Sequence, residues 1–526
     1  MSKLQRVYRV ASFLLVTLCL SEATAQDAAL TRPIPMVLPA PEEMGNGPSH
    51  FFLVRSDLMG IVDPIEGQII FLDNSGAIVG RAPLPSNFRV GSIAPAPGGV
   101  MLRTSDGRQL LIPSNVDPKQ PSFTTVRAVP KSSLADNYVM RIDPKTMQLR
   151  PAQANQQVIE VKSITGGQLA EIENLGVDQR GNRYALWSEI TAVQPVLNVE
   201  SFAGRFNAAG VLTGIARVPL ADMEIVPNRP ALVTPNGALR VLVPGKAGVA
   251  IREYSFQPIA GGGRAGNTTA NGPAILKSLD GGPSATVISL PSKIVDPGVT
   301  KQNFRWPPED KTARAAKPLK EISRQDILKN AKAYIGVQWI LSATNFENSQ
   351  IANECAKENG RYWQRPSFLT SDSVGKKITR IPYNWGGFDT PEAFAKKMND
   401  GKLAGNVCTC REPEYNYCQV PEAAGVDCSG FVSRAWGLPE KQGTSQLAET
   451  TVSKAITSIL DVRPGDAFDR PGSHVRLVFG TVEGANLTFV ILESTTAPAC
   501  EGVCEQNYTA KQLSGYKPIR YKLVVD

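Results

Sequence analysis

Histidine is nearly absent from this sequence: only His50 and His474 occur among its 526 residues. Imidazole is the commonest side-chain ligand of zinc and of many iron sites, so this scarcity argues against a metal centre built on histidine. We expect neither a bound metal nor a cofactor. A general base that uses an imidazole ring must be one of these two residues.

Long apolar runs are also missing from most of the chain. The apolar stretch at residues 11–20 is too short to span a bilayer. Basic residues precede it and a small-x-small site follows at residues 23–25, so residues 1–25 are predicted to be a secretory signal peptide. No later segment has the roughly 18 uninterrupted apolar residues of a membrane span, so we expect no transmembrane segment. The mature protein is expected in the periplasm or outside the cell.

Charge is not concentrated anywhere along the chain. Only 20% of residues are charged, and the 56 Lys and Arg residues are scattered rather than clustered. The net charge of +8 therefore predicts a mild attraction to anionic surfaces and no nucleic-acid groove.

Cysteine is absent from residues 20–354 and then occurs seven times. An exported protein can form disulfides, and an odd number of cysteines leaves at least one thiol over. The zinc-like spacing at 408–418 lacks both a CxxC pair and a nearby histidine, so no zinc site is predicted. Cys500 and Cys504 are a plausible local pair, but the remaining connectivity is not readable. The seven residues are Cys355, Cys408, Cys410, Cys418, Cys428, Cys500 and Cys504.

Residues 49–256 read as a series of short apolar runs that meet at Gly, Asn and Asp turns. These residue types tolerate the positive φ that tight hairpins need. The pattern predicts a repetitive all-β domain, and its length would suit a β-propeller of about five or six blades. A pair of β-sandwiches is the alternative, because no blade signature recurs. The predicted hairpins lie at 69–80, 100–113, 175–187, 204–218 and 231–244.

The segments on either side of this region have a different composition. Residues 26–48 are rich in Pro and Ala and predict an extended lead-in, whereas residues 257–322 predict a Gly- and Pro-rich linker in which a short apolar run at 285–290 allows one strand. Residues 323–526 have the size of one α+β domain. His50, at the edge of the β region, has no acid or thiol motif beside it and is predicted to be an ordinary surface or turn residue.

The segment GVDCSGFVSRAWG at 425–437 carries the clearest chemical signal. Apolar residues at helical spacing follow Cys428, which places this cysteine at the N-terminus of a predicted helix. Unpaired N–H groups and the helix dipole favour the thiolate there, which is the nucleophilic form. A buried structural thiol is the alternative.

His474 opens the alternating segment HVRLVFG and is the only imidazole in this half of the chain. If Gly480 pairs with Leu487 on the returning strand, His474 faces Glu493 on the same side of the sheet, about 5 Å away. Glu493 would then accept the imidazole N–H and fix the tautomer. If the register slips, Ser494 or a loop residue takes that place.

Four motifs in order carry a resemblance. PYNWGG (382–387), DCSGFV (427–432), RPGD (463–466) and SHV (473–475) resemble the NlpC family of papain-like cysteine peptidases, which cut peptide stems of bacterial peptidoglycan. The resemblance covers about residues 323–520. It implies a multidomain protein, with an all-β, propeller-like N-terminal domain and an α+β papain-like C-terminal domain.

The resemblance also implies roles for individual residues. Cys428 would be the nucleophile, His474 the base and Glu493 the third polar residue, although the family more often carries His, Asn or Gln at that place. Residues 388–426 separate two motifs that lie close together in compact relatives, so we expect a flap that begins with a helix near 390–392 and is stapled by disulfides. Residues expected to shape the substrate cleft are Tyr383, Trp385, Asp427 and Ser429.

The resemblance implies a secreted cell-wall hydrolase that cuts amide bonds in peptidoglycan stem peptides, beside a D-γ-glutamyl residue. The β domain would target or regulate it by binding a glycan or a protein. Two alternatives remain open: a thiol amidase or acyltransferase that acts on another substrate, and an envelope binding protein without activity.

Overall fold

A computed structural model provides the structure of the chain. It describes residues 32–37, 47–85, 88–104, 107–121, 123–126, 138–151, 157–259, 279, 285–295, 318–346, 357–358, 360–410, 415–482, 484–497 and 500–526. The predicted signal peptide at residues 1–25 and Cys355 lie outside the described residues.

The N-terminal region consists of five antiparallel sheets that follow one another along the chain. Each is built mainly from consecutive strands joined by short turns, so the region is all-β. The sheets are β2 (His50–Arg55), β3 (Leu58–Asp63), β4 (Gln68–Asp73) and β5 (Ile78–Pro83); β6 (Ser92–Ala96), β7 (Gly99–Arg103), β8 (Gln109–Pro113) and β9 (Thr124–Val126); β10 (Tyr138–Asp143), β11 (Thr146–Arg150) and β12 (Ile159–Lys162); β13 (Gln168–Val177), β14 (Arg183–Ala192), β15 (Asn198–Phe206), β16 (Leu212–Val218) and β20 (Gln257–Pro258); and β17 (Ala231–Val233), β18 (Leu239–Gly245), β19 (Gly248–Tyr254) and β21 (Ala285–Ser289).

All five predicted hairpins are confirmed: β4–β5, β7–β8, β13–β14, β15–β16 and β17–β18 pair as antiparallel neighbours. The turn glycines Gly76, Gly181 and Gly237 have φ of 86°, 80° and 87°. Glycine adopts this left-handed conformation without the steric cost that a Cβ would add, which explains why the turns could be located from the sequence.

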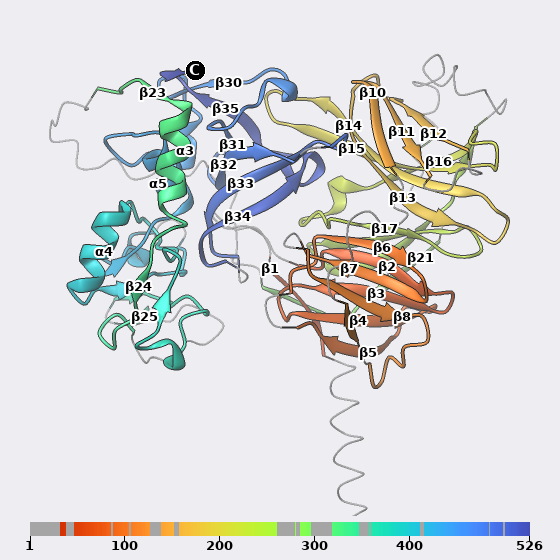
Figure 1. Cartoon of the computed structure of the whole chain (residues 1–526), viewed down its shortest axis with the longest axis horizontal. Coiled ribbons are helices and arrows are strands. Elements are labelled where there is room, and N and C mark those ends of the chain that lie inside the picture. Colours follow the sequence, from red (N-terminus) through yellow and green to blue (C-terminus); the bar gives the residue numbers. More distant parts are fainter. Residues whose placement is uncertain are drawn as a thin grey trace, which may run out of the picture.

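The five sheets follow one another in space (Figure 1), and apolar clusters of the described residues fill the space between four pairs of them. Sheet β2–β5 shares one cluster with sheet β6–β9 and another with sheet β17–β21. Strand β4 is accordingly buried along most of its length, because both of its faces are covered. Sheets stacked in this chain order have a propeller-like arrangement.

Segments outside the predicted β region complete it. Strand β1 (Ile34–Val37) pairs in parallel with β22 (Ser292–Val295), and β21 extends the sheet of β17–β19. The segment expected to be a linker therefore contains three strands, β20, β21 and β22, that belong to the N-terminal region.

A six-stranded antiparallel sheet organises the C-terminal region, in the order β30, β35, β31, β32, β33, β34. Helices α3 and α5 lie side by side next to this sheet, and α5 contacts β32 and β33 (Figure 1). The sheet comprises β30 (Ser453–Ala455), β31 (Ala467–Arg470), β32 (His474–Thr481), β33 (Thr488–Thr495), β34 (Gly502–Thr509) and β35 (Lys517–Tyr521), and the helices are α3 (Arg324–Ala333), α4 (Pro391–Asn399), α5 (Cys428–Ala435) and α6 (Thr444–Leu447).

Short ladders and single helical turns make up the remaining elements. The two-stranded ladders are β23 (Ile322–Ser323) with β36 (Val524–Val525), β24 (Trp339–Ile340) with β27 (Lys377–Ile378), β25 (Lys357–Glu358) with β26 (Arg361–Tyr362), and β28 (Leu403–Ala404) with β29 (Ala423–Ala424). The 3₁₀ turns are η2 (Leu220–Asp222), η4 (Ser371–Ser373), η5 (Tyr415–Cys418), η6 (Ile459–Asp461) and η7 (Ala510–Leu513).

The structure corrects the expected fold class. The four α-helices among the described residues are only 10, 9, 8 and 4 residues long, and strands dominate the chain. No α+β papain-like domain is evident in the described part of the C-terminal region, so that expectation is wrong. Two well-capped helices, α3 behind Ser323 and α4 behind Thr390, do form where their caps indicated. Strands and loops nevertheless supply much of the core, through residues such as Leu341, Ile381 and Leu477.

The two regions are packed against each other through a common apolar cluster. Leu197 and Val199 of the N-terminal region belong to this cluster together with Phe468 and Phe489 of the C-terminal sheet. At its edge, Leu197 N–H donates to the Tyr516 carbonyl (2.7 Å). The apolar cluster and the backbone hydrogen bond together hold the N-terminal region against one face of the C-terminal sheet.

His50 does not lie where it was expected. It is 2% exposed, and Ser49 Oγ lies 2.9 Å from its Nδ1. Burial, together with the charges of Arg229 and Lys511, lowers the pKa of His50 to about 3. His50 is therefore a buried neutral residue where the two regions meet, not a surface residue.

No helix among the described residues has both the length and the apolar character needed to cross a bilayer.

Candidate functional site

Cys428 is the first residue of helix α5, and its place is set by the residue before it. Asp427 is the N-cap, and its Oδ1 accepts hydrogen bonds from Gly430 N–H (2.6 Å) and Ser429 Oγ (3.1 Å). An aspartate cap satisfies N–H groups that the first helical turn leaves unpaired. The sequence D-C-S-G therefore starts the helix at the cysteine.

The other oxygen of Asp427 ties this helix to the preceding chain. Oδ2 accepts from Gly386 N–H (2.9 Å) and pairs with Lys441 Nζ (2.7 Å), and both side chains of the pair are buried. Gly430 allows the close approach, since a Cβ there would lie 2.1 Å from the Gly387 carbonyl oxygen. Asp427 and Ser429, expected in the substrate cleft, thus hold the start of α5 in place.

Helix α5 packs on strands β32 and β33, and His474 is the first residue of β32. Ser494 Oγ on β33 donates to the Val426 carbonyl (2.6 Å), which fixes the chain just before Cys428 to the sheet. Cys428 and His474 are both fully buried. The predicted nucleophile and base therefore lie at the starts of two elements in contact.

His474 Nε2 lies 2.8 Å from Glu493 Oε2, and neither side chain is exposed. A carboxylate in this position accepts a hydrogen bond from the Nε2–H group, and Nδ1 is then the basic nitrogen of the neutral ring. The contact between the predicted base and the predicted third residue is present.

Glu493 is held by two further residues that sequence reasoning missed. Arg476 Nε lies 3.2 Å from Oε2, and the Tyr508 hydroxyl donates to Oε1 (2.6 Å). Burial alone would raise the pKa of Glu493, but the Arg476 charge and the hydrogen bonds from His474 and Tyr508 lower it to about 2. Glu493 is therefore ionised at neutral pH. Arg476 could have been found from strand parity, because residues two apart share a face with His474.

The strand register differs from the prediction. Leu477 pairs with Leu492, Val478 with Ile491 and Gly480 with Val490, so the expected Gly480–Leu487 pairing is wrong. The observed partner differs from the expected one by three residues at Gly480, and the bulge between Val478 and Gly480 reduces this difference to two, which restores the expected face of the strand. His474 still reaches Glu493, because the long carboxylate side chain spans a diagonal position on the same face.

Tyr383 and Trp385, also expected in the cleft, are 0% and 1% exposed. Both lie in a buried cluster with Cys408, Cys410 and Cys418, where Trp385 N–H donates to the Asn406 carbonyl (3.0 Å). In this structure they support the segment before Cys428 rather than line a surface.

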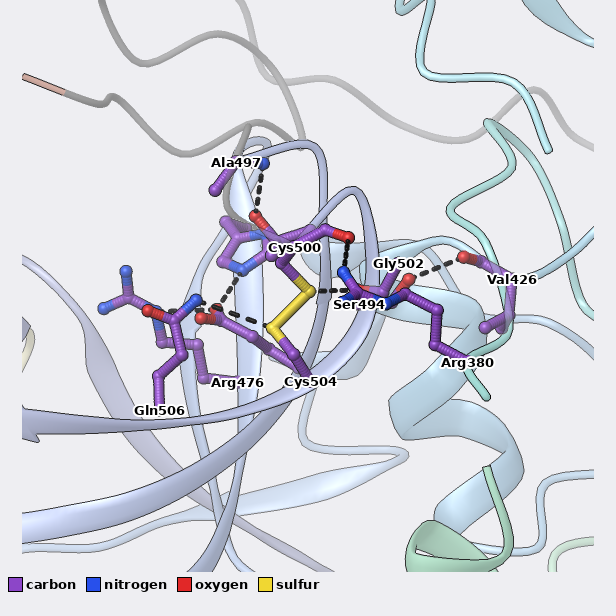
Figure 2. Close-up of a disulfide and its surroundings, with 12 residues drawn as sticks. Arg380, Val426, Arg476, Ser494, Ala497, Cys500, Gly502, Cys504 and Gln506 are labelled. Atoms are coloured by element: carbon purple, nitrogen blue, oxygen red, sulfur yellow. Dashed lines mark hydrogen bonds and ion pairs between the residues drawn. A yellow bond between two sulfur atoms is a disulfide. The ribbon is translucent and has the colours of Figure 1, made fainter. Parts of the chain in front are cut away.

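Disulfides leave one described cysteine as a thiol, and that residue is Cys428. Cys410 is bonded to Cys418, and Cys500 to Cys504 as the spacing suggested; Cys408 is disulfide-bonded as well. Figure 2 shows the Cys500–Cys504 bond between Arg476 and Gln506 on one side and Arg380 and Gly502 on the other. Among the described residues, no group of three or more His, Cys, Asp or Glu side chains could hold a metal ion.

Glu501, inside the Cys500–Cys504 loop, anchors this loop to the chain before Tyr383. Its Oε2 accepts from Ser367 Oγ (2.6 Å), and its carbonyl accepts from Tyr383 N–H (2.9 Å). Burial raises the pKa of Glu501 to about 7, although the Ser367 hydrogen bonds and the Arg380 charge oppose the shift. The folded protein therefore favours the neutral carboxyl.

Relative to wild type, Glu501→Gln is expected to gain stability as pH rises from about 4.5 through 7. A carboxyl whose pKa is raised on folding adds stability below its unfolded value near 4.5, and this stability is lost as pH rises through 7. The variant should thus gain up to about 3 kcal/mol over wild type between pH 5 and pH 8, because each tenfold change in proton affinity is worth on the order of 1.4 kcal/mol. Urea unfolding at both pH values measures it, with the exposed Glu449→Gln as control. A gain that does not vary with pH would contradict the assignment.

Comparisons with known proteins identify no family. No family model matches the chain, so no family match supports the NlpC resemblance, and no curated protein matches. Solved structures with partial similarity include virginiamycin B lyase from Staphylococcus aureus (14% identity, 40% of this chain, 70% of that chain, TM-score 0.17). Regucalcin from Agrobacterium tumefaciens is similar at 14% identity over 43% of this chain and 78% of that chain, with a TM-score of 0.20. The Nup133 β-propeller domain of Vanderwaltozyma polyspora is similar at 11% identity over 39% of this chain and 69% of that chain, with a TM-score of 0.17. At these TM-scores the similarities carry no argument about function.

Proposed function

We propose that this chain is an exported cell-wall hydrolase that cleaves amide bonds in peptidoglycan stem peptides. Cys428 is the nucleophile, His474 the base, and Glu493 the residue that positions the base. The observation that carries the proposal is the reduced Cys428 thiol at the start of α5, a helix packed on the strands that bear the buried His474–Glu493 pair. The four ordered motifs shared with NlpC family cysteine peptidases favour the cell wall as substrate.

The reaction proposed is acyl transfer to sulfur. His474 Nδ1 takes the thiol proton, and Cys428 Sγ attacks the carbonyl carbon of the amide. The tetrahedral oxyanion is held by backbone donors that include the Cys428 N–H, which lies in the first turn, where a helix offers no carbonyl of its own. The imidazolium returns its proton to the leaving amine, and water then hydrolyses the thioester. Glu493 stabilises the imidazolium through Nε2.

The N-terminal β region is assigned to targeting or regulation. It packs against the C-terminal sheet and contributes no residue to the Cys428–His474–Glu493 set. A glycan or a protein in the envelope is the ligand class proposed for it.

The full burial of Cys428 and His474 favours a second candidate, an envelope binding protein without turnover. A working hydrolase must let reagents reach the sulfur, whereas a purely structural thiol need not. Iodoacetamide at neutral pH, followed by peptide mass mapping, separates the two: selective labelling of Cys428 supports the hydrolase, and an unlabelled Cys428 supports the binding protein.

Digestion of purified peptidoglycan by the mature protein, with the product masses measured, tests the proposed function. Release of fragments cut within the stem peptide, beside the γ-linked glutamyl residue, is the expected result. An intact cell wall, together with cleavage of an unrelated amide or ester, would show instead a thiol amidase or acyltransferase that acts on another substrate.

A further inference from the structure

A cavity of about 530 Å³ lies where the N-terminal β region meets the C-terminal sheet. Cavities of this size accommodate small ligands or a few residues of a peptide. Both regions supply its walls, so neither region forms it alone. Its lining includes Ser49, Phe88 and Arg89 from the N-terminal side and Arg470, Gln506 and Tyr516 from the C-terminal side.

The cavity adjoins the proposed catalytic residues. Ser473, the residue before His474, lines it, as do Arg476 and Tyr508. Together with His474, Arg476 and Tyr508 contact the Glu493 carboxylate (3.2 and 2.6 Å). A ligand in this cavity would therefore lie against the residues that hold the base.

The charges on the lining are unbalanced. Among the described residues that line the cavity, three are arginines and Glu224 alone is acidic. Glu224 pairs with Lys246 (3.6 Å), and Arg476 pairs with Glu493. Within the described part of the chain, no carboxylate forms an ion pair with either of the other two arginines, Arg89 and Arg470. The cavity thus presents two positive charges that no carboxylate of the described residues neutralises through an ion pair.

A further guanidinium, that of Arg380, interacts with Arg89 from outside the cavity wall and also with the Glu501 carboxyl. Burial, and then the charge of Arg380, lower the pKa of Arg89, so these two arginines from different regions repel each other. Arg380 is held in place by the Cys500 carbonyl (2.7 Å) beside the disulfide (Figure 2). An anion at this side of the cavity would relieve the repulsion.

We propose that this cavity binds a free carboxylate of the substrate peptide, recognised by Arg89 and Arg470. Guanidinium groups suit this task because their planar donors bind a carboxylate through two parallel hydrogen bonds. A γ-linked glutamyl residue retains its α-carboxylate, so a stem peptide carries a suitable group. The inference rests on the proposed function, since Ser473, Arg476 and Tyr508 of the cavity wall lie next to the proposed base or contact its carboxylate partner.

Binding to the full mature chain with Cys428→Ala tests the inference without turnover. The probes are the tripeptide L-Ala-γ-D-Glu-L-Lys and its counterpart in which the glutamyl α-carboxylate is amidated, titrated by calorimetry. The free acid should bind at least tenfold more tightly than the amide. In the same background, Arg89→Gln and Arg470→Gln should each weaken binding of the free acid about tenfold and leave binding of the amide unchanged. Exposed Arg180→Gln, outside the cavity, is the matched control.

Equal affinity for acid and amide would overturn the inference, and so would displacement of the free acid by an equal concentration of inorganic phosphate. The comparison of the two probes needs no substitution in the cavity, so it stands even if an arginine variant misfolds. If the wild-type protein digests peptidoglycan but the Cys428→Ala protein binds acid and amide equally, the carboxylate site is refuted and the proposed hydrolase function stands. If the free acid binds in a manner that depends on Arg89 and Arg470 but the wild-type protein does not hydrolyse peptidoglycan, the carboxylate site stands and the proposed hydrolase function is refuted.

Discussion

Cys428→Ala is expected to reduce the release of stem peptides from peptidoglycan to the uncatalysed background. The sulfur forms the covalent bond with the substrate, and every other described cysteine is held in a disulfide. Loss of a nucleophile costs other acyl-transfer enzymes on the order of 10⁴-fold or more in rate. Mass spectrometry of the soluble products measures the loss.

The fold of this variant should persist, because alanine keeps the helix start and the Asp427 cap remains. A thermal transition within a few degrees of wild type, with the two described disulfides intact, provides this control. His474→Gln should lose activity to a similar extent, and the double variant should be no worse than either single one, since the two residues act as a unit. If Cys428→Ala digested peptidoglycan at the wild-type rate, the proposed mechanism would be wrong.

Local features of this chain could be predicted from its sequence. Glycine turns such as Gly76 and Gly237 locate hairpins because few other residues adopt their φ, and Asp427 indicates a helix start because its carboxylate caps N–H groups. The contact between His474 and Glu493 was also expected, although for the wrong pairing.

Features that depend on distant contacts could not be predicted. The bulge beyond Val478 changes which residues pair across the two strands, and no residue type at that position indicates a bulge. The low pKa of the buried His50 depends in part on the charge of Lys511, which lies hundreds of residues further along the chain. The cavity exists only because two regions meet, so Arg89 and Arg470 had no visible relation in the sequence.

The papain-like fold was expected from short motifs, and this expectation failed because short motifs do not determine how distant elements pack. Short motifs around Cys428 and His474 describe a few residues of local geometry, whereas a fold depends on how all the elements pack. The four helices near this site are short, and strands and loops fill the core that longer helices would have supplied. A chemical proposal can therefore rest on the site while the fold assignment is corrected.

Glu493→Gln is expected to cost both activity and stability, and the two losses can be separated. The amide no longer fixes the imidazole tautomer or stabilises its charge, so kcat/KM should fall on the order of 10²- to 10⁴-fold. It also leaves Arg476 buried without its counter-ion, which typically costs about 3–5 kcal/mol of folding free energy. Hydrolysis rates and urea unfolding measure the two effects, with the exposed Glu505→Gln on strand β34 as control.

The pH dependence distinguishes this role from general destabilisation. The pKa of Glu493 is lowered to about 2, so its contribution to stability is complete above the unfolded value near 4.5 and is lost as pH falls through 2. Glu493→Gln should therefore lack the part of the acid unfolding that this carboxylate causes. Adding Arg476→Met removes the uncompensated charge and should restore part of the stability, yet activity should stay low because His474 still lacks its carboxylate. Recovery of activity together with stability would show that Glu493 serves the fold alone and does not position the base.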